Sequence, residues 1–144
     1  MLGNTIFFPL VDVDTRIVRR VQKAWRRLLS AGEATGWTLI EADREPTEDL
    51  MTQIAAVSSG KIIIIAEDPQ QGRLTAATAL RTGLIPVIIG YPHDYRPVLT
   101  HLYNGIVTGP SSTAAIATAL RQLTADPRRR AAMHHNAYVN QSHT

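Results

Sequence analysis

The chain has 144 residues, of which 44% are hydrophobic and 19% are charged. This length and composition are typical of one globular domain; they exclude a chain disordered throughout and a pair of ordinary-sized domains. Fifteen Lys and Arg residues against twelve Asp and Glu residues give a formal net charge of +3. Cysteine is absent, which excludes a disulfide framework, a thiolate metal site and a cysteine nucleophile.

No targeting segment is recognisable in the sequence. The first ten residues lack the basic start and the apolar run of a signal peptide. No apolar segment reaches the roughly 18 residues that a transmembrane helix needs. We therefore expect a cytoplasmic protein with no transmembrane segment.

Hydrophobic runs alternate with segments of helical periodicity along the chain. Short apolar runs predict five strands, at residues 4–9, 37–41, 61–66, 85–89 and 104–107. The run 61–66 shows no polar alternation, which is typical of a strand in the centre of a parallel sheet.

Helices are expected between and after these strands. The first begins at Thr15 with Asp14 as its N-cap, and the second begins at residues 45–47 with Pro46 in its first turn. A loop at 67–72 leads to a helix through 76–80, and two more helices cover 114–123 and the residues after 126–127. The order predicts one α/β domain over residues 1–144, Rossmann-like and doubly wound, with a mainly parallel five-stranded sheet, helices on both faces and a polar tail from about residue 134.

Three segments after about residue 75 occur in a characteristic order. Residues 76–89 form a helix, a glycine turn at Gly83 and a strand ending in Pro-Val; residues 104–112 form an Asn-Gly strand and a Gly-Pro-Ser-Ser loop; residues 114–133 form a helix pair. The series resembles the C-terminal nucleotide-sugar-binding domain of GT-B glycosyltransferases, in particular the retaining family of sucrose and glycogen synthases and bacterial mannosyltransferases. This resemblance implies hexosyl transfer from a nucleotide diphosphate sugar.

The resemblance also implies a set of binding residues. Phosphates need cationic side chains and backbone N–H donors, and in doubly wound sheets such sites lie at the carboxyl ends of the strands. Arg16 lies eight residues before Ala24-Trp25, where the family has a phosphate-binding lysine. The candidate nucleotide-sugar-binding residues are Arg16, Gln70, Gly72, Arg73, Leu74, Thr75, Thr78 and His93.

The chain departs from the family at the positions that matter most for catalysis. The family has two glutamates eight positions apart, and Gln70 and Thr78 occupy those positions here. Glu67 and Asp68 lie just upstream and would replace the first glutamate after a loop shift, whereas Thr78 has no acidic neighbour. No catalytic residue is therefore assigned.

Two functions remain open under this resemblance. The first is a glycosyltransferase-like domain that binds a nucleotide-sugar donor and needs a partner chain or self-association to complete an active site. The alternative is a non-catalytic relative that acts as an interaction or regulatory subunit. Both predict association, and exposed apolar residues around Tyr91, Tyr95 and Tyr103 offer one surface for it.

Two other enzyme and signalling classes fit the length and strand pattern less well. Asp12 and Asp14 resemble the acidic pair of a phosphoacceptor receiver domain; Asp68 could supply its third aspartate, but residues 107–109 supply no lysine. A nucleoside deoxyribosyltransferase-like domain would need a catalytic glutamate after Gly72, and none follows.

We expect the remaining charged segments to be solvent-exposed surface and not binding sites. The basic run 16–27 is a solvated helix face rather than a nucleic-acid or membrane surface, since Trp25 is its lone aromatic residue. His134, His135 and His143 have no carboxylate at ligand spacing. We expect no metal, no cofactor and no nucleic-acid partner.

Overall fold

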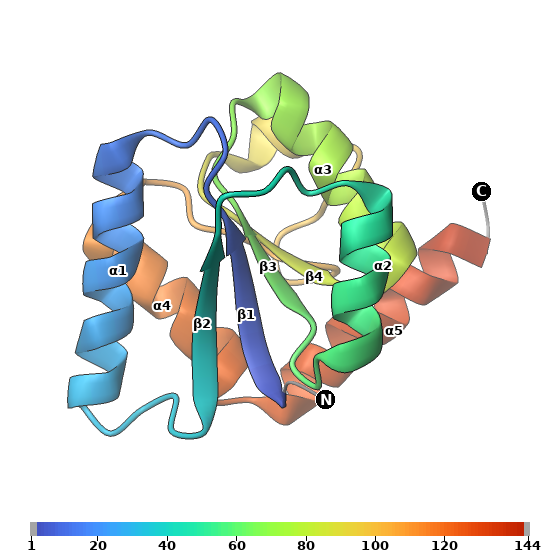
Figure 1. Ribbon diagram of the computed structural model, residues 1–144. Coiled ribbons are helices and arrows are strands. Elements are labelled where there is room, and N and C mark those ends of the chain that lie inside the picture. Colours follow the sequence, from blue (N-terminus) through green and yellow to red (C-terminus); the bar gives the residue numbers. More distant parts are fainter. Residues whose placement is uncertain (1–2, 143–144) are drawn as a thin grey trace.

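The computed structural model describes residues 3–142 and places five parallel strands in one sheet, in the order β2-β1-β3-β4-β5 (Figure 1). The strands are β1 (Asn4–Pro9), β2 (Trp37–Ala42), β3 (Ile62–Ile65), β4 (Ile85–Ile88) and β5 (Ile106–Val107). The helices are α1 (Thr15–Ser30), α2 (Glu48–Val57), α3 (Pro69–Thr82), a 3₁₀ turn η1 (Pro92–Tyr95), α4 (Thr113–Thr124) and α5 (Pro127–Ser142). The predicted doubly wound α/β class is confirmed.

Strand β3 lies at the centre of the sheet, as its unbroken apolar sequence predicts. It pairs with β1 on one side and β4 on the other, with Ile62 opposite Ile6 and Ile85. All four of its isoleucines are at most 1% exposed. Successive side chains of a strand point to opposite faces, so β3 contributes two isoleucines to the core on each side.

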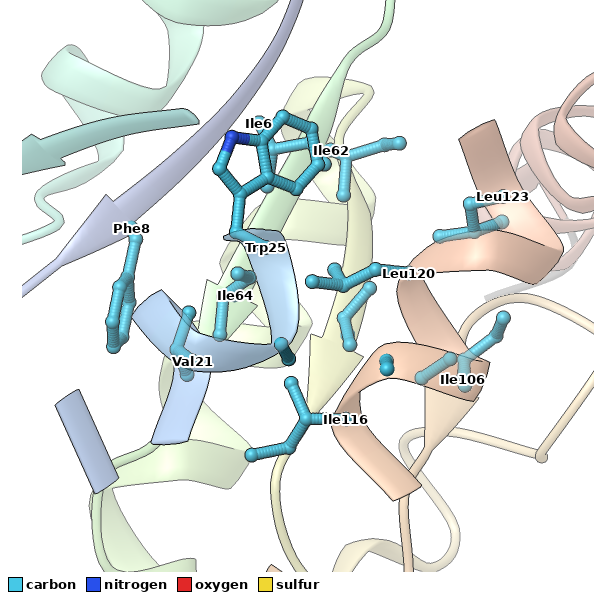
Figure 2. Close-up of a cluster of buried hydrophobic side chains, with 14 of the residues drawn as sticks. Ile6, Phe8, Val21, Trp25, Ile62, Ile64, Ile106, Ile116, Leu120 and Leu123 are labelled. Carbon is cyan, nitrogen blue, oxygen red and sulfur yellow. The ribbon is translucent and has the colours of Figure 1, made fainter. Parts of the chain in front are cut away.

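Helices cover both faces of the sheet. Helices α1 and α4 pack on one face, where Trp25 and Leu120 meet Ile6 and Ile64 in one buried cluster (Figure 2). Helices α2 and α3 cover the other face, where Met51 contributes to a second buried cluster with β3. The periodic apolar stripes of the helices therefore face the sheet. The loop after each strand determines on which face of the sheet the next helix packs.

Two helix starts differ from the sequence expectation. Thr47 is the N-cap of α2, and its hydroxyl accepts a hydrogen bond from the Leu50 N–H at 3.2 Å, so Pro46 lies before the helix and not in its first turn. Helix α3 begins at Pro69, because the Asp68 carboxylate caps it by accepting from the backbone N–H groups of Gln70 and Gln71. The expected loop at 67–72 is thus largely the first turn of α3.

The C-terminal segment also differs from the expected polar tail. Helix α5 continues through His134 to Ser142. His134 is tied to the fold by a 2.8 Å hydrogen bond between its Nε2 and the Gly83 carbonyl oxygen. This contact with the C-terminal end of α3 therefore holds a part of α5 that is polar in sequence. His143, considered above with the other histidines, lies outside the described residues.

The N-cap of α4 gives a direct test of how this helix is held. The Ser112 hydroxyl accepts from the Ala115 N–H at 3.1 Å. We expect Ser112→Ala to lower the free energy of unfolding by about 1 kcal/mol, because one donor of the first turn loses its partner. Urea unfolding measures this loss. Ser112→Asp, which keeps an acceptor, should retain the stability, and an equal loss in both variants would contradict the capping role.

Candidate functional site

A cleft of about 490 Å³ opens at the carboxyl edge of the sheet. The chain leaves β1 for α1 on one face of the sheet and leaves the adjacent β3 for α3 on the other face. Ligands of open α/β sheets bind at such a switch point, where neighbouring loops diverge. The cleft is lined by residues that follow β1, β2 and β3, namely Val11, Asp12, Glu45, Pro46, Thr47, Glu67, Asp68 and Gln71. We call it the carboxyl-edge cleft.

The lining of the carboxyl-edge cleft is strongly acidic. Four carboxylates contribute to it, from Asp12, Glu45, Glu67 and Asp68, and no Lys, Arg or His residue lines it. Asp12 has a φ of 60°, a left-handed conformation that Asp adopts more readily than most residues. The protein as a whole has a positive formal charge, so this acidity is a local property of one edge of the sheet.

Glu67 is the most constrained of these carboxylates. Among the described residues, its Oε1 atom is buried and has no hydrogen-bond partner. Burial raises the pKa of Glu67, the Thr75 hydroxyl acts in the opposite direction, and the carboxylates of Asp68 and other cleft residues raise it further. A carboxyl group with a raised pKa in a cleft is a candidate for proton transfer or for close contact with a ligand.

Tyr95, the last residue of η1, is buried in the cluster that includes Ala76 and Ala79 of α3. It is 1% exposed, and its hydroxyl is buried without a hydrogen-bond partner among the described residues. Burial, followed by the charge of Glu67, raises the pKa of Tyr95 to about 12, so the phenol stays protonated at neutral pH. The hydroxyl lies so close to Gly72 that a Cβ atom there would be 2.3 Å from it.

This contact predicts an effect opposite to helix propensity. In a helix, alanine is more favourable than glycine by about 1 kcal/mol. We nevertheless expect Gly72→Ala to lower the free energy of unfolding by about 1–2 kcal/mol, because the new methyl group would overlap the buried Tyr95 hydroxyl. In a Tyr95→Phe background, chemical denaturation should show most of that loss recovered. The same loss in both backgrounds would exclude this contact as the cause.

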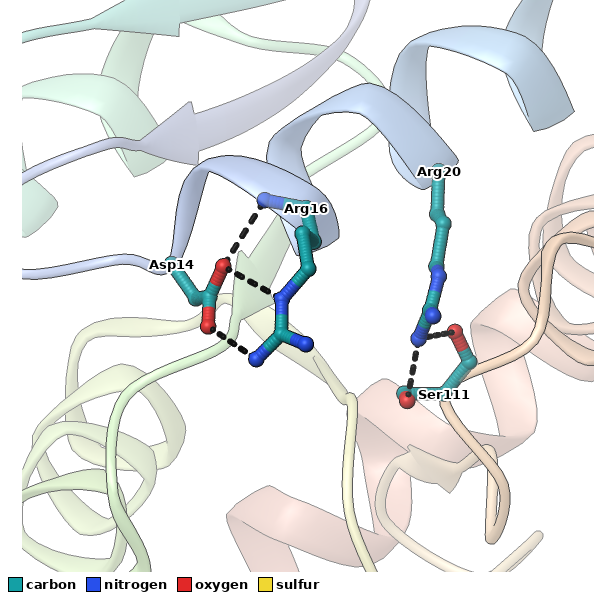
Figure 3. Close-up of polar contacts among 4 residues, drawn as sticks. All are labelled: Asp14, Arg16, Arg20 and Ser111. Atoms are coloured by element: carbon teal, nitrogen blue, oxygen red, sulfur yellow. Dashed lines mark hydrogen bonds and ion pairs between the residues drawn. The ribbon is translucent and has the colours of Figure 1, made fainter.

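Arg16, the predicted phosphate ligand, is bound by its own helix cap (Figure 3). Its backbone N–H donates to Asp14 Oδ1 at 2.8 Å, and its guanidinium pairs with Asp14 Oδ2 at 3.1 Å. The Arg16 side chain is 77% exposed and does not line the carboxyl-edge cleft. In the same view, Arg20 donates to the Ser111 hydroxyl at 2.9 Å and joins α1 to the loop before α4.

The structure brings some of the other predicted residues together, but not around a cavity. Arg73 donates to the Asp94 carbonyl oxygen at 2.8 Å, which joins α3 to η1. His93 lies 3.3 Å from the carboxylate of its neighbour Asp94, within η1. The remaining residues lie along α3. Gln70 is exposed, Leu74 is 62% exposed, and the exposed Thr78 hydroxyl donates to a backbone carbonyl of its own helix. None of the eight predicted residues lines the carboxyl-edge cleft.

Sequence reasoning noticed most of the acidic residues but assigned them to other sites. Asp12 entered with Asp14 as a receiver-like acidic pair, Asp68 entered as the candidate third aspartate of that site, and Glu67 and Asp68 entered as replacements for a sugar-binding glutamate. Glu45 was missed, although the clustering of carboxylates after consecutive strands was available as a signal. The expected association surface also needs correction, because Tyr95 is buried whereas Tyr91 and Tyr103 are 53% and 40% exposed.

Residues 3–142 contain neither a group of metal-ligating side chains nor a membrane-spanning helix. Within residues 3–142, no three His, Cys, Asp or Glu side chains form a group that could hold a metal ion. None of the helices in this part of the chain has the length and apolar character needed to cross a bilayer.

Comparison with known proteins does not support the glycosyltransferase resemblance. No model of a protein family matches the chain, and no curated protein matches it. Among solved structures, it is similar to a diflavin flavoprotein A3 from Nostoc sp., with 10% identity, a TM-score of 0.39 and coverage of 98% of this chain and 95% of that chain.

The assignment to GT-B glycosyltransferases and the expected nucleotide-sugar function are wrong, because Arg16 is paired with Asp14 and none of the predicted binding residues lines the cleft at the switch point. The segments that suggested them, such as the glycine turn at Gly83 and the strand after it, are ordinary parts of a parallel α/β fold. Gly83 is a left-handed C-cap of α3 with a φ of 94°. The cleft at the switch point, in turn, carries carboxylates where a diphosphate would need cations.

Proposed function

We propose that this chain is a small-molecule-binding domain whose ligand occupies the carboxyl-edge cleft and presents several hydrogen-bond donors to it. A protonated amine and a ribosyl diol both meet this requirement, because each donates several hydrogen bonds. The observation that carries the proposal is the lining itself, in which four carboxylates and no cation surround a cleft at the β1–β3 switch point.

The acidic lining selects the ligand by charge and by hydrogen-bonding type. Ionised carboxylates accept hydrogen bonds and donate none, and they are strong partners for ammonium and hydroxyl groups. A phosphate or carboxylate ligand would instead meet Asp12, Glu45 and Asp68 without a compensating cation. Clefts lined by one sign of charge also concentrate ligands of the opposite sign.

Glu67 gives the proposed site a dependence on pH. Its raised pKa means that the carboxyl becomes protonated at a higher pH than an ordinary glutamate does. We expect affinity for an amine ligand to fall as the pH decreases through this raised pKa, because the protonated form loses its charge and one acceptor. Calorimetric titrations over a pH series measure this change, and a profile set by an unperturbed carboxyl would argue against Glu67 as the group involved.

The experiment that tests the proposal is calorimetric titration with putrescine as the amine and adenosine as the diol. Binding of either ligand should weaken about tenfold in Asp12→Asn, since a charge-assisted hydrogen bond is lost. Asp43→Asn removes the same charge from an exposed residue outside the cleft and should leave binding within about twofold.

The two ligand sources are distinguished by salt. Putrescine binding should weaken as ionic strength rises, whereas adenosine binding should change little. If neither compound binds, or if both variants weaken binding equally, the carboxyl-edge cleft is not the ligand site.

A further inference from the structure

A second cavity, of about 550 Å³, lies at the opposite edge of the sheet. Its walls come from the turn before β3, from the first residue of β4 and from one face of α5, which passes the starting ends of the strands in Figure 1. We call it the amino-edge pocket. It shares no lining residue with the carboxyl-edge cleft, and its volume is in the range of small-molecule sites.

The charge of the amino-edge pocket is opposite to that of the carboxyl-edge cleft. Lys61, Arg130, His134 and His135 line it, and no Asp or Glu residue does. Asp126, which directly precedes α5, pairs with Arg129 at 3.7 Å and accepts the Arg129 backbone N–H as a helix cap. The positive groups in the lining are therefore not neutralised by a carboxylate of the pocket.

Arg130 is fixed in position by the surrounding fold. Its guanidinium lies over the Trp37 ring, with 4.8 Å between Cζ and the ring centroid. One guanidinium nitrogen, Nη1, donates to the carbonyl oxygens of Leu123 and Thr124 at the end of α4. A guanidinium has five N–H donors, so donors remain for a ligand after these contacts.

Lys61 is placed in the lining by an unusual backbone conformation. Its φ is 55°, in the left-handed region that non-glycine residues seldom adopt. The turn is held because the Lys61 N–H donates to the Ser58 hydroxyl at 3.1 Å and the Lys61 carbonyl accepts from Ile85 at 2.7 Å. Gly60 beside it has no room for a side chain, since a Cβ atom would lie 2.4 Å from the Trp37 ring. Rare backbone conformations that the surrounding structure holds in place cluster at functional sites.

His134 and Tyr138 complete the pocket on the side of α5. The Gly83 carbonyl oxygen can only accept, so His134 Nε2 is the donor in the 2.8 Å contact between them. Tyr138 is 71% exposed and adds an aromatic surface to the same wall. The pocket therefore combines cationic groups with an apolar wall.

We propose that the amino-edge pocket binds a small phosphorylated molecule, with Lys61 and Arg130 as the groups that contact its phosphate. A phosphate dianion is the ligand that best matches a guanidinium, an ammonium group and two imidazoles in a lining that contains no carboxylate. The proposal is independent of the function proposed for the carboxyl-edge cleft, because the two sites have opposite charge and no residue in common.

The test uses inorganic pyrophosphate as the probe, followed by two-dimensional amide NMR of the full chain. We expect saturable shift changes at Gly60, Lys61, Ile85 and Ala131, and none that track them at Asp12 or Asp68. Lys61→Asn removes the ammonium group and keeps a residue that tolerates the left-handed conformation; it should weaken binding about tenfold. Lys23→Gln removes the same charge from the exposed face of α1 and should change affinity less than twofold.

Each other outcome overturns the proposal. Saturable shifts confined to α1, or equal weakening by Lys61→Asn and Lys23→Gln, would mean that pyrophosphate follows net charge and not this pocket. No binding to the wild-type protein would contradict the proposal regardless of any variant. If Lys61→Asn does not fold, Lys61→Gly replaces it, since glycine also accepts the left-handed conformation, and undiminished binding in that variant counts against the pocket.

Discussion

Replacing Glu67 with glutamine is expected to weaken ligand binding at the carboxyl-edge cleft at least about tenfold and, at pH 7, to make the protein more stable. The loss of binding follows from removing a charged acceptor whose Oε1 atom is buried and has no partner among the described residues. The gain in stability follows from the direction of the pKa change. An amide of the same shape avoids the unfavourable burial of a negative charge beside other carboxylates.

The sign of the stability effect follows from proton linkage. The folded state raises the pKa of Glu67 above its unfolded value, so the folded state binds the proton more tightly. The contribution of Glu67 to stability is therefore present below the unfolded pKa and is lost as the pH rises through the folded pKa. At neutral pH the wild-type carboxylate opposes folding, and Glu67→Gln removes that opposition.

Urea unfolding at pH 7 and calorimetric titration with the ligand measure the two effects on one variant. Glu41→Gln is the matched control, because Glu41 is exposed and bonds to Gln22 outside the cleft. It should change neither quantity by much. Lower stability of Glu67→Gln at pH 7 would contradict this account, because it would show that the Glu67 carboxylate stabilises the folded protein.

Replacing Ile64 with alanine is expected to lower the free energy of unfolding by about 2–5 kcal/mol, more than any other substitution proposed for this protein. Ile64 is fully buried at the centre of β3 and belongs to the cluster between the sheet and helices α1 and α4. Truncation removes buried apolar surface and leaves a cavity that a five-stranded sheet cannot easily close.

The exposed Leu74 on α3 provides the matched comparison for Ile64. Leu74 is 62% exposed, so Leu74→Ala should change stability by no more than about 0.5 kcal/mol. Urea unfolding of both variants under the same conditions separates burial from residue type. Equal losses at the two positions would contradict the placement of β3 in the centre of the sheet.

Most of the fold was predictable because local signals and burial agree in this sequence. The isoleucine run of β3 indicates a central strand without reference to the rest of the chain, and Asp14 caps α1 as its position predicts. Predictions failed where two neighbouring signals compete for the same boundary. Pro46 and Thr47 both mark a helix start, and the hydrogen bond from Leu50 N–H to the Thr47 hydroxyl decides between them. Similarly, Asp68 and Pro69 begin α3 before Gly72, which by itself suggests a loop.

The candidate site was harder to predict because it is assembled from loops that are distant in sequence. Asp12, Glu45 and Glu67 are brought to one cleft by the strand order β2-β1-β3, and a linear reading does not give that order. The ion pair between Arg16 and Asp14 was likewise not predictable, because it depends on where the two side chains lie. The spacing of Arg16 from Ala24-Trp25 fits a phosphate ligand equally well. Motif order in the second half of the chain reflected the shared geometry of parallel α/β folds and not a shared donor site.

The most direct test of the carboxyl-edge site is an amide NMR titration of the wild-type chain with putrescine, repeated with adenosine. Our account predicts saturable shift changes for one or both ligands, clustered at Asp12, Thr47, Asp68 and Gln71, where β1, β2 and β3 end. Shifts of this pattern that disappear in Glu67→Gln would establish the acidic cleft as the ligand site. Saturable shifts at another surface, with these residues unchanged, would contradict the account.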